Sequence, residues 1–375
     1  MFEILKRDSR SHARLGRLTS RHGAIDTPVF IPVGTAATVK AVPHESLESM
    51  GAQIVLANTY HLYLRPGGER IARLGGLHRF MSWPHPILTD SGGFQIFSQR
   101  GLSSVSQEGA YFTSHLDGSR HLFTPEKAIE VQQQLGSDIM MVLDECTPYP
   151  CTRFEAAKSL EVTMNWAERS HRFYSGRTNG EQKLFGIVQG SVYMDLRAES
   201  SQRLREMPFD GYSIGGLSVG EPKAAMYEVA TQCSQLLPDL TPRYLMGVGT
   251  PSDLLECVGA GIDMFDCVLP TRNARNGYLF TSRGRLSIKN SRFAEDSRPP
   301  DESCSCPVCR RFCRAYLRHL WMSGEILSSV LNTLHNLYFY LDLMSKIRQS
   351  IASQNFADFR TRFLTQYQSG DGGNL

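Results

Sequence analysis

The sequence has no long apolar run. No segment approaches the roughly 18 consecutive apolar residues that a membrane span requires, and the first eight residues lack the apolar stretch of a secretory signal peptide. Hydrophobic residues make up 41% of the 375-residue chain and charged residues 21%, as in soluble globular proteins. We therefore expect a cytoplasmic protein with no membrane partner.

The chain also carries little net charge, but the charge is unevenly placed. The formal net charge is +3. Between Arg272 and Arg318, eleven Lys and Arg accompany four Asp and Glu, a local charge of +7 that leaves about −4 for the remainder. A basic segment on a slightly acidic body indicates a site for a polyanion such as nucleic acid. A basic surface that is merely exposed to solvent would show the same excess of Lys and Arg over Asp and Glu.

Two common enzyme signatures are missing. No G-x-G-x-x-G follows the first expected strand, which argues against a dinucleotide-binding doubly wound sheet. His61 has no His-x-His partner, which a metal-dependent barrel hydrolase would need. Short apolar runs bounded by turn residues recur instead, at 29–33, 54–57, 87–89, 139–143, 184–188, 212–214, 244–248 and 264–269.

These eight runs predict the fold class. They do not alternate with polar residues, which is typical of strands buried on both faces. Segments long enough for helices lie between them, such as 125–135, 155–172 and 194–205. Eight β units joined by helices predict an α/β protein with a (β/α)8 barrel, and a doubly wound sheet is the competing architecture.

The expected domain organisation follows from this pattern. We expect the barrel over residues 1–277, interrupted at about 98–123 by an insertion in which Asp117–Gly118 marks a hairpin turn. A basic, cysteine-containing subdomain is expected over 278–335 and C-terminal helices that close the barrel over 336–368. The Gly-rich tail, 369–375, is expected to be disordered.

Polar residues and glycines follow the predicted strands. These residues are Asn58, Asp90, Asp144, Gln189, Gly215 and Gly216, while Asp266 lies within the last run. The carboxyl ends of barrel strands meet at one rim, where active sites form. A single Asp there could simply cap a helix, but several carboxylates together predict an active site.

Asp266 interrupts an apolar run, and a basic segment follows it. Burying a carboxylate costs several kcal/mol unless the group is paired or used. A buried salt bridge to Arg272 or Arg275 is one explanation of the pattern, and chemistry at Asp266 is the other.

Three of the nine cysteines lie within one turn, at Cys304, Cys306 and Cys309. In a reducing compartment this crowding indicates metal rather than disulfides. A fourth ligand would complete a tetrahedral structural zinc site, and Cys313 is the local candidate. Free thiols are the alternative.

Several motifs in one order resemble those of the tRNA-guanine transglycosylases. They are TPVFIPVGT at 27–35, NTYHL at 58–62, TDSGGFQ at 89–95, FGIVQG at 185–190, GGLSVGE at 215–221 and FDCVLPTR at 265–272. The resemblance extends from about Arg14 to about Phe356. It implies a homodimer of barrels and one structural Zn²⁺ held by Cys304, Cys306, Cys309 and the distant His335.

The resemblance also implies a reaction. The enzyme would be a pentosyltransferase of queuosine biosynthesis that exchanges guanine-34 in the GUN anticodons of tRNA for Asp, Asn, His and Tyr. The incoming base would be 7-aminomethyl-7-deazaguanine, preQ1. Asp266 would be the nucleophile of a double displacement through a covalent enzyme–RNA intermediate, and Asp90 the general acid/base.

The base pocket and the tRNA contacts are assigned by the same match. The pocket would comprise Asp90, Ser91, Gly92, Gly93, Phe94, Asp144, Gln189, Gly216, Leu217, Val219, Glu221 and Met246. Asp144 and Gln189 would read the polar edge of the base, Glu221 would orient the Gly216–Leu217 backbone, and Phe94 and Met246 would sandwich the ring unless they are core residues. The tRNA phosphates would be held by Arg272, Arg275, Arg283, Arg285 and Lys289.

Two related functions remain open at this point. Queuine could be the incoming base, although Val219 would crowd its larger substituent. A non-catalytic tRNA-binding paralogue would be expected to lack the nucleophile, and Asp266 is present.

Overall fold

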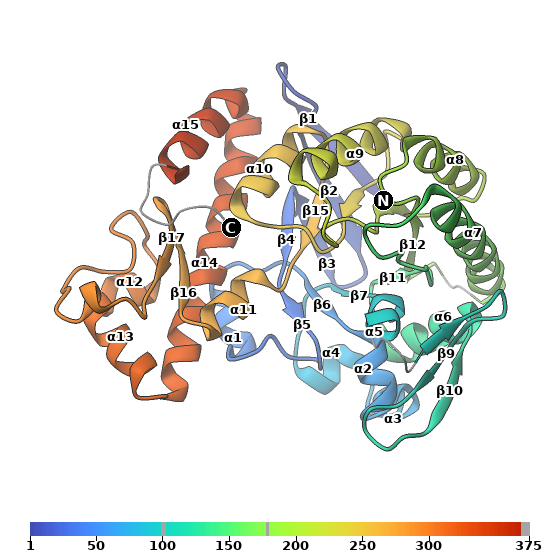
Figure 1. The fold of residues 1–375 in the computed structure, drawn as a ribbon, viewed down its shortest axis with the longest axis horizontal. Coiled ribbons are helices and arrows are strands. Elements are labelled where there is room, and N and C mark those ends of the chain that lie inside the picture. Colours follow the sequence, from blue (N-terminus) through green and yellow to red (C-terminus); the bar gives the residue numbers. More distant parts are fainter. Residues whose placement is uncertain (99–102, 178–179, 369–375) are drawn as a thin grey trace.

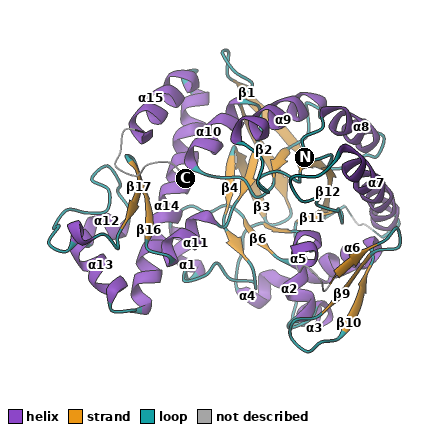
Figure 2. Ribbon diagram, viewed as in Figure 1, coloured by secondary structure: helices purple, strands orange, loops and turns teal. Residues whose placement is uncertain are grey.

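The computed structural model describes residues 1–98, 103–177 and 180–368 (Figure 1). The expected tail at 369–375 lies outside the described residues. A parallel sheet forms the centre, with helices around it and a separate C-terminal lobe beside it (Figures 1 and 2).

The central sheet returns on itself. Its order is β4-β15-β14-β13-β12-β11-β7-β6-β5, and every pairing is parallel. Its strands are β4 (Val29–Ile31), β5 (Val33–Gly34), β6 (Val55–Ala57), β7 (Ile87–Thr89), β11 (Ile139–Met141), β12 (Lys183–Val188), β13 (Gly211–Ile214), β14 (Arg243–Leu245) and β15 (Met264–Asp266). Only Pro32 separates β4 from β5. Because proline has no N–H for the ladder, the first barrel strand is split in two, and the predicted α/β barrel is confirmed.

Helices connect the barrel strands, and one more follows the last strand, β15. They are α1 (His44–Ser49), α2 (Thr59–Leu64), α3 (Gly68–Arg73), α4 (Gly76–Met81), α5 (Gly93–Ser98), α6 (Pro125–Leu135), α7 (Arg153–Ser175), α8 (Met194–Arg205), α9 (Lys223–Leu236), α10 (Pro251–Gly259) and α11 (Leu269–Arg275). Local signals fix several ends. A capping box between Thr152 and Glu155 begins α7, and Gly136 ends α6 in the left-handed conformation.

Several strands are shorter than the apolar runs predicted. β11 ends at Met141, β14 at Leu245 and β15 at Asp266, so Asp266 is the last residue of its strand rather than an interior one. The prediction of a strand up to residue 269 is wrong because α11 begins there, with Pro270 in its first turn, where the missing N–H costs nothing.

Two antiparallel sheets lie outside the barrel. The insertion contains β8 (Ser103–Val105), β9 (Ala110–Thr113) and β10 (Arg120–Phe123), so the predicted hairpin has a third strand. The N-terminal sheet of β1 (Phe2–Arg7), β2 (Arg14–Ser20) and β3 (Gly23–Thr27) was not predicted.

The C-terminal lobe is tied to the barrel by one long helix. The lobe contains β16 (Tyr278–Thr281), β17 (Gly284–Ser287), the 3-10 turn η1 (Ser291–Phe293), α12 (Pro307–Arg311) and α13 (Arg314–Met322). α14 (Ile326–Ala352) packs against α13, β16 and α11, and α15 (Phe356–Gln368) follows it. The apolar stripe of α14, Leu337, Leu341, Met344, Ile347 and Ile351, is buried as predicted. Across the described ranges, no helix is long and apolar enough to cross a membrane.

Candidate active site

Asp266 stands at the carboxyl end of β15 and has no cationic partner among the described residues. Its Oδ1 accepts hydrogen bonds from the Tyr244 hydroxyl and, at 2.8 Å, from the Gly247 backbone N–H. Neither Arg272 nor Arg275 forms an ion pair with it in the described structure, so the salt-bridge explanation is wrong. Burial raises the pKa of Asp266, against the lowering effect of its two donors.

Asp90 follows β7 and is buried. Asn58 donates to its Oδ2, and the Thr59 backbone N–H donates to its Oδ1 at 2.8 Å. Asp90 therefore does accept a helix N–H, but from the start of α2 rather than from the helix that follows it in sequence. Burial raises the pKa of Asp90 to about 6, and the negative charge of Asp266 acts in the same direction. A pKa of this value suits proton transfer near neutral pH.

Asp144 lies after β11 and is held by neutral donors. Gln189 Nε2 donates to Asp144 Oδ2 at 2.7 Å, and Ser91 Oγ donates to Oδ1 at 3.4 Å. Burial raises the pKa of Asp144 to about 6. The other amide atom, Gln189 Oε1, is buried and has no hydrogen-bond partner in the part of the chain that the structure describes. A Cβ at Gly216 would lie 2.3 Å from that oxygen, so only glycine leaves it room. This buried, unsatisfied acceptor requires a donor from a ligand or from water.

The loop after β13 is fixed by Glu221. Its carboxylate accepts the N–H groups of Ser218, at 2.5 Å, and Val219, at 3.0 Å. We expected Glu221 to orient the Gly216–Leu217 peptide. It instead orients the next peptide along the chain, Leu217–Ser218, and the one after it. Because N–H and C=O of a trans peptide point in opposite directions, the Leu217 carbonyl is turned away from Glu221.

The two residues expected to sandwich a base differ in burial. Phe94, on α5, is 57% exposed, which excludes the core interpretation. Met246, just after β14, is half-buried and packs against the main hydrophobic core.

Arg197 was not identified from the sequence. This α8 side chain is fully buried and donates to three backbone carbonyls, those of Ser191 at 2.7 Å and of Val188 and Gly215 at 2.8 Å. It thereby ties the loop that carries Gln189 to the loop after β13. An arginine on a polar helix gives no local sign of this role, and neither does Tyr244, whose hydroxyl reaches Asp266.

The residues expected to hold phosphates lie on α11 and on the β16–β17 hairpin. Arg272 is exposed and Arg275 half-buried on α11, and Arg283 is exposed between the two strands. The Arg285 guanidinium lies 4.5 Å from the centre of the Tyr278 ring. Lys289 Nζ lies 4.8 Å from the same ring and 4.9 Å from that of Trp321. Their contact with RNA stays a prediction.

Cys304, Cys306, Cys309 and His335 form a group whose ligand atoms all lie within 4.8 Å of one another. His335 Nδ1 is 3.4 Å from Cys306 Sγ and 3.3 Å from Cys309 Sγ. His335 Nε2 lies 2.8 Å from the Phe280 carbonyl oxygen, which can only accept, so the proton sits on Nε2 and the Nδ1 lone pair faces the thiols. The group could hold a metal ion, and Cys313 is not part of it.

Comparison with known proteins agrees with this geometry. The model of the queuine tRNA-ribosyltransferase family matches residues 8–369. A queuine tRNA-ribosyltransferase of Thermoanaerobacter pseudethanolicus is 55% identical over 366 residues, 98% of this chain and 97% of its own. Those of Desulforudis audaxviator and Syntrophobacter fumaroxidans are each 56% identical, over 97% and 96% of both chains respectively. The chain therefore belongs to the queuine tRNA-ribosyltransferase family, the tRNA-guanine transglycosylases.

Proposed function

We propose that this enzyme exchanges guanine-34 in GUN-anticodon tRNA for preQ1 by double displacement. The observation that carries the proposal is the set of three carboxylates at one rim of the barrel. Asp90, Asp144 and Asp266 are enclosed, each has a raised pKa, and none is neutralised by a cation in the described residues.

Asp266 is the nucleophile in this proposal. As the glycosidic bond to guanine breaks, positive charge develops on the ribose, and an anionic carboxylate stabilises that charge and then bonds to C1′. Tyr244 and Gly247 both bind Oδ1, which leaves Oδ2 for the bond to ribose. The incoming base then attacks C1′ through its N9 and releases Asp266.

Asp90 moves the proton in both halves of the exchange. It donates a proton to guanine as that base leaves, and it accepts the N9 proton of preQ1 as the new bond forms. A group with a pKa of about 6 serves both directions near neutral pH. Asp90 thus gives one proton and takes one back in each complete exchange, so no other proton donor or acceptor is needed.

Base recognition falls to Asp144, Gln189 and the loop after β13. The Asp144 carboxylate accepts N–H groups of a guanine-like edge, and the unsatisfied Gln189 Oε1 accepts another. Phe94 and Met246 lie against the two faces of the ring after the base leaves its stack. The Leu217 carbonyl is turned away from Glu221 and accepts a hydrogen bond from the ammonium group of preQ1. Val219 limits the size of the substituent that the incoming base can carry. Queuine is the alternative base.

The cysteine group holds one structural Zn²⁺ in this proposal. Three thiolates and one imidazole nitrogen fit a closed tetrahedral site, which leaves no open position for catalysis. When bound, the ion would cross-link the cysteines to His335 on α14 and so fasten the basic lobe to the barrel.

We further propose that the enzyme acts as a cytoplasmic homodimer. Large apolar side chains are exposed near the junction of α13 and α14, with Met322 60% and Ile326 82% exposed and Leu327 and Tyr316 also exposed. Exposed apolar side chains of this kind are suited to contact with a second copy.

The direct test is incubation with GUN-anticodon tRNA and radiolabelled guanine. We expect label to enter the tRNA, and unlabelled preQ1 to displace it irreversibly. A tRNA that carries adenine at position 34 is the control. Absence of label from GUN tRNA, with tRNA binding intact, would instead support the non-catalytic tRNA-binding paralogue.

A further inference from the structure

Arg197, on α8, differs from the other buried arginines of this chain. Among the described residues three arginines are buried, namely Arg14, Arg197 and Arg243. Arg14 Nη2 lies 2.5 Å from Asp263 Oδ2. Arg243 Nη2 lies 3.5 Å from Asp239 Oδ1. No carboxylate in the described ranges forms an ion pair with Arg197, whose three side-chain hydrogen bonds go to backbone carbonyls.

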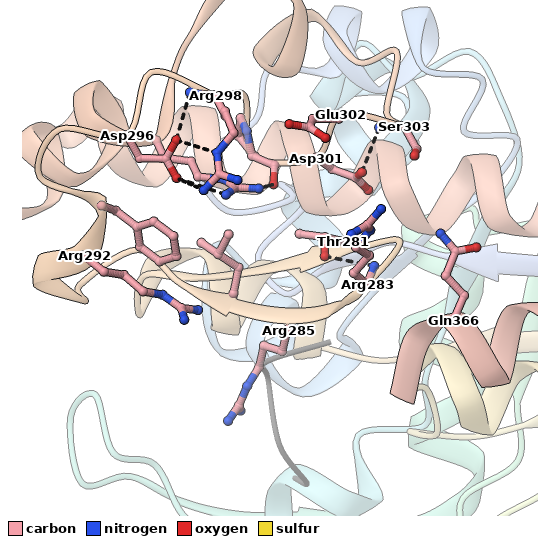
Figure 3. A pocket seen from close by; sticks show the side chains of 14 residues that line it. Thr281, Arg283, Arg285, Arg292, Asp296, Arg298, Asp301, Glu302, Ser303 and Gln366 are labelled. Atoms are coloured by element: carbon pink, nitrogen blue, oxygen red, sulfur yellow. Dashed lines mark hydrogen bonds and ion pairs between the residues drawn. The ribbon is translucent and has the colours of Figure 1, made fainter. Parts of the chain in front are cut away.

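Partly exposed arginines also meet carboxylates. Beside a cavity of about 660 Å³ in the C-terminal lobe, Asp296 binds Arg298 at 2.8 Å (Figure 3) and the half-buried Arg314 at 3.1 Å. A charge taken out of water is costly unless a counter-ion or hydrogen bonds replace its hydration, and burial lowers the pKa of Arg197 accordingly. A neutral side chain would avoid this cost, which indicates that the guanidinium of Arg197 is kept for its hydrogen-bond donors.

These donors meet backbone at the point where two strands end. β12 ends at Val188 and β13 at Ile214, and beyond a strand end the carbonyl groups need donors from outside the sheet. Arg197 Nη1 donates to the carbonyls of Val188 and Gly215, each at 2.8 Å. Its Nε donates to the Ser191 carbonyl at 2.7 Å. The planar fork of an arginine reaches all three carbonyls at once, which neither lysine nor glutamine can do.

The three carbonyls flank the groups that face the base in the proposed function. Gln189 lies between two of them in sequence, and Gly216 follows the third. The gap between the two loops is narrow, because a Cβ at Gly215 would lie 2.8 Å from Gln189 Nε2 and one at Gly216 would lie 2.3 Å from Gln189 Oε1. The place of the Gln189 amide therefore depends on the separation of the loops. The Asp144 carboxylate, which accepts from that amide at 2.7 Å, depends on it in turn.

We infer that Arg197 is a positioning residue for base recognition. It holds the two loops at one separation, and it thereby places the Gln189 amide and the Asp144 carboxylate for the edge of a guanine-like base. The inference rests on the proposed function and extends it to a side chain that is fully buried. The competing explanation is that Arg197 stabilises the barrel with no bearing on the base.

The test compares changes at two buried arginines. Arg197→Lys keeps the charge but loses the fork, and Arg197→Gln keeps a planar amide without the charge. Arg243→Lys is the matched control, because Arg243 is buried at the amino end of β14 and also binds a backbone carbonyl, that of Leu237 at 3.3 Å. Equilibrium dialysis with radiolabelled guanine, in the absence of tRNA, measures base affinity, and filter binding measures tRNA affinity.

We expect both Arg197 variants to weaken guanine binding by about 10- to 100-fold, since a displaced buried hydrogen-bonding group costs that much. Their tRNA affinity should stay within about threefold, because phosphate contacts supply most of it. Arg243→Lys should lower the unfolding midpoint and leave guanine affinity within about threefold of the unmodified enzyme.

A double-mutant cycle with Gln189→Ala separates positioning from general stability. In the Gln189→Ala background, Arg197→Lys should weaken guanine binding by less than about threefold. An equal loss in both backgrounds, a loss of the same size in Arg243→Lys, or unchanged guanine affinity in a folded Arg197 variant would overturn the inference.

Hydrogen exchange of the unmodified enzyme gives a decision that needs no folded variant. The amides of Gln189 and Gly215 should be protected before guanine is added and should change less than about threefold on binding. If guanine slows their exchange by more than about tenfold, the base rather than Arg197 sets the loops and the inference is wrong. Absence of guanine binding to the unmodified enzyme would instead contradict the proposed function.

Discussion

The two ends of strand β15 carry the same side chain in opposite circumstances. Asp263, just before the strand, is fully buried and accepts two hydrogen bonds from the Arg14 guanidinium, at 2.9 Å and 2.5 Å, and one from Arg243 N at 2.7 Å. Asp266, three residues later, is bound within the described ranges by the neutral donors Tyr244 and Gly247. At the amino end of β15 the Asp263 carboxylate is paired with the Arg14 cation. At the carboxyl end the Asp266 carboxylate has neutral hydrogen-bond donors in place of a cation.

Strand β11 repeats the contrast. Asp138, just before it, binds His78 Nε2 at 3.0 Å, Ile87 N at 2.9 Å and His22 Nδ1 at 2.9 Å. Although burial alone would raise it, these donors bring the pKa of Asp138 down to about 2. After the strand, Asp144 has a pKa raised to about 6. Asp263 and Asp138, at the amino ends of their strands, thus pair with basic side chains, whereas Asp266 and Asp144, at the carboxyl ends, are bound by neutral donors among the described residues.

The largest expected effect is on catalysis at the open end. Asp266→Asn keeps the shape of the side chain but removes its charge and its nucleophilic oxygen. We expect guanine exchange to fall by about 10⁴-fold or more, with tRNA affinity and the unfolding midpoint nearly unchanged. Single-turnover exchange at saturating tRNA measures the loss. Retention of more than about a tenth of the rate would move the nucleophile to another carboxylate.

The matched change at the closed end should act on stability. Asp263→Asn removes the buried charge partner of Arg14 and leaves it the exposed Asp239, 3.6 Å away, which costs about 3–5 kcal/mol. Denaturant unfolding measures the loss, and exchange per folded molecule at low temperature should stay within about threefold of the unmodified enzyme. A large loss of specific activity without loss of stability would contradict the assignment of Asp263 to stability and of Asp266 to catalysis.

Asp90 and Asp138 should contribute with opposite sign to the pH dependence of stability, whereas Asp263, at the amino end of β15, has a pKa that its burial raises. Asp90 has a raised pKa, so the folded protein binds its proton more tightly than the unfolded chain. That stabilisation is complete below about pH 4 and is lost as the pH rises through about 6. Asp138 has a lowered pKa, so its contribution is present above about pH 4 and is lost as the pH falls through about 2.

Unfolding free energies of Asp90→Asn and Asp138→Asn between pH 3 and 7.5 test this. Relative to the unmodified enzyme, Asp90→Asn should gain about 2–3 kcal/mol from pH 4 to 7, whereas Asp138→Asn should be most destabilised at neutral pH. Parallel pH profiles in the two variants would contradict the pKa shifts on which the contrast rests.

The smallest effect concerns the choice of base. Val219, anchored by Glu221, should admit the aminomethyl group of preQ1 and crowd the cyclopentenediol of queuine. Overpacking of this kind costs roughly 1–3 kcal/mol, so Val219→Gly should relax selectivity by tens-fold in a competition assay. Equal use of both bases by the unmodified enzyme would remove Val219 from this role.

The sequence predicted the open end well and the closed end poorly, for a physical reason. Apolar runs locate parallel strands, and the residue after each run must lie at the common rim. Asp90, Asp144 and Asp266 were found in this way. Which carboxylate meets a cation is decided by tertiary structure. The neighbours of Asp266 in sequence, Arg272 and Arg275, suggested a pairing that does not exist.

The pairing that does exist joins Asp263 to Arg14, 249 positions away. Arg14 belongs to the N-terminal sheet, whose strands were not predicted. The buried Arg197 lies on a helix that was predicted, but its role was missed for another reason. Its partners are backbone carbonyls of two loops, which have no signature in side-chain pattern.

The most direct test of the account is capture of the covalent intermediate. The enzyme is incubated with GUN-anticodon tRNA without incoming base and resolved by denaturing electrophoresis. We expect a protein–tRNA adduct with the unmodified enzyme and with Asp263→Asn below its unfolding temperature, and none with Asp266→Asn. An adduct that survives Asp266→Asn, or that disappears with folded Asp263→Asn, would contradict the assignment of chemistry to one end of β15 and stability to the other.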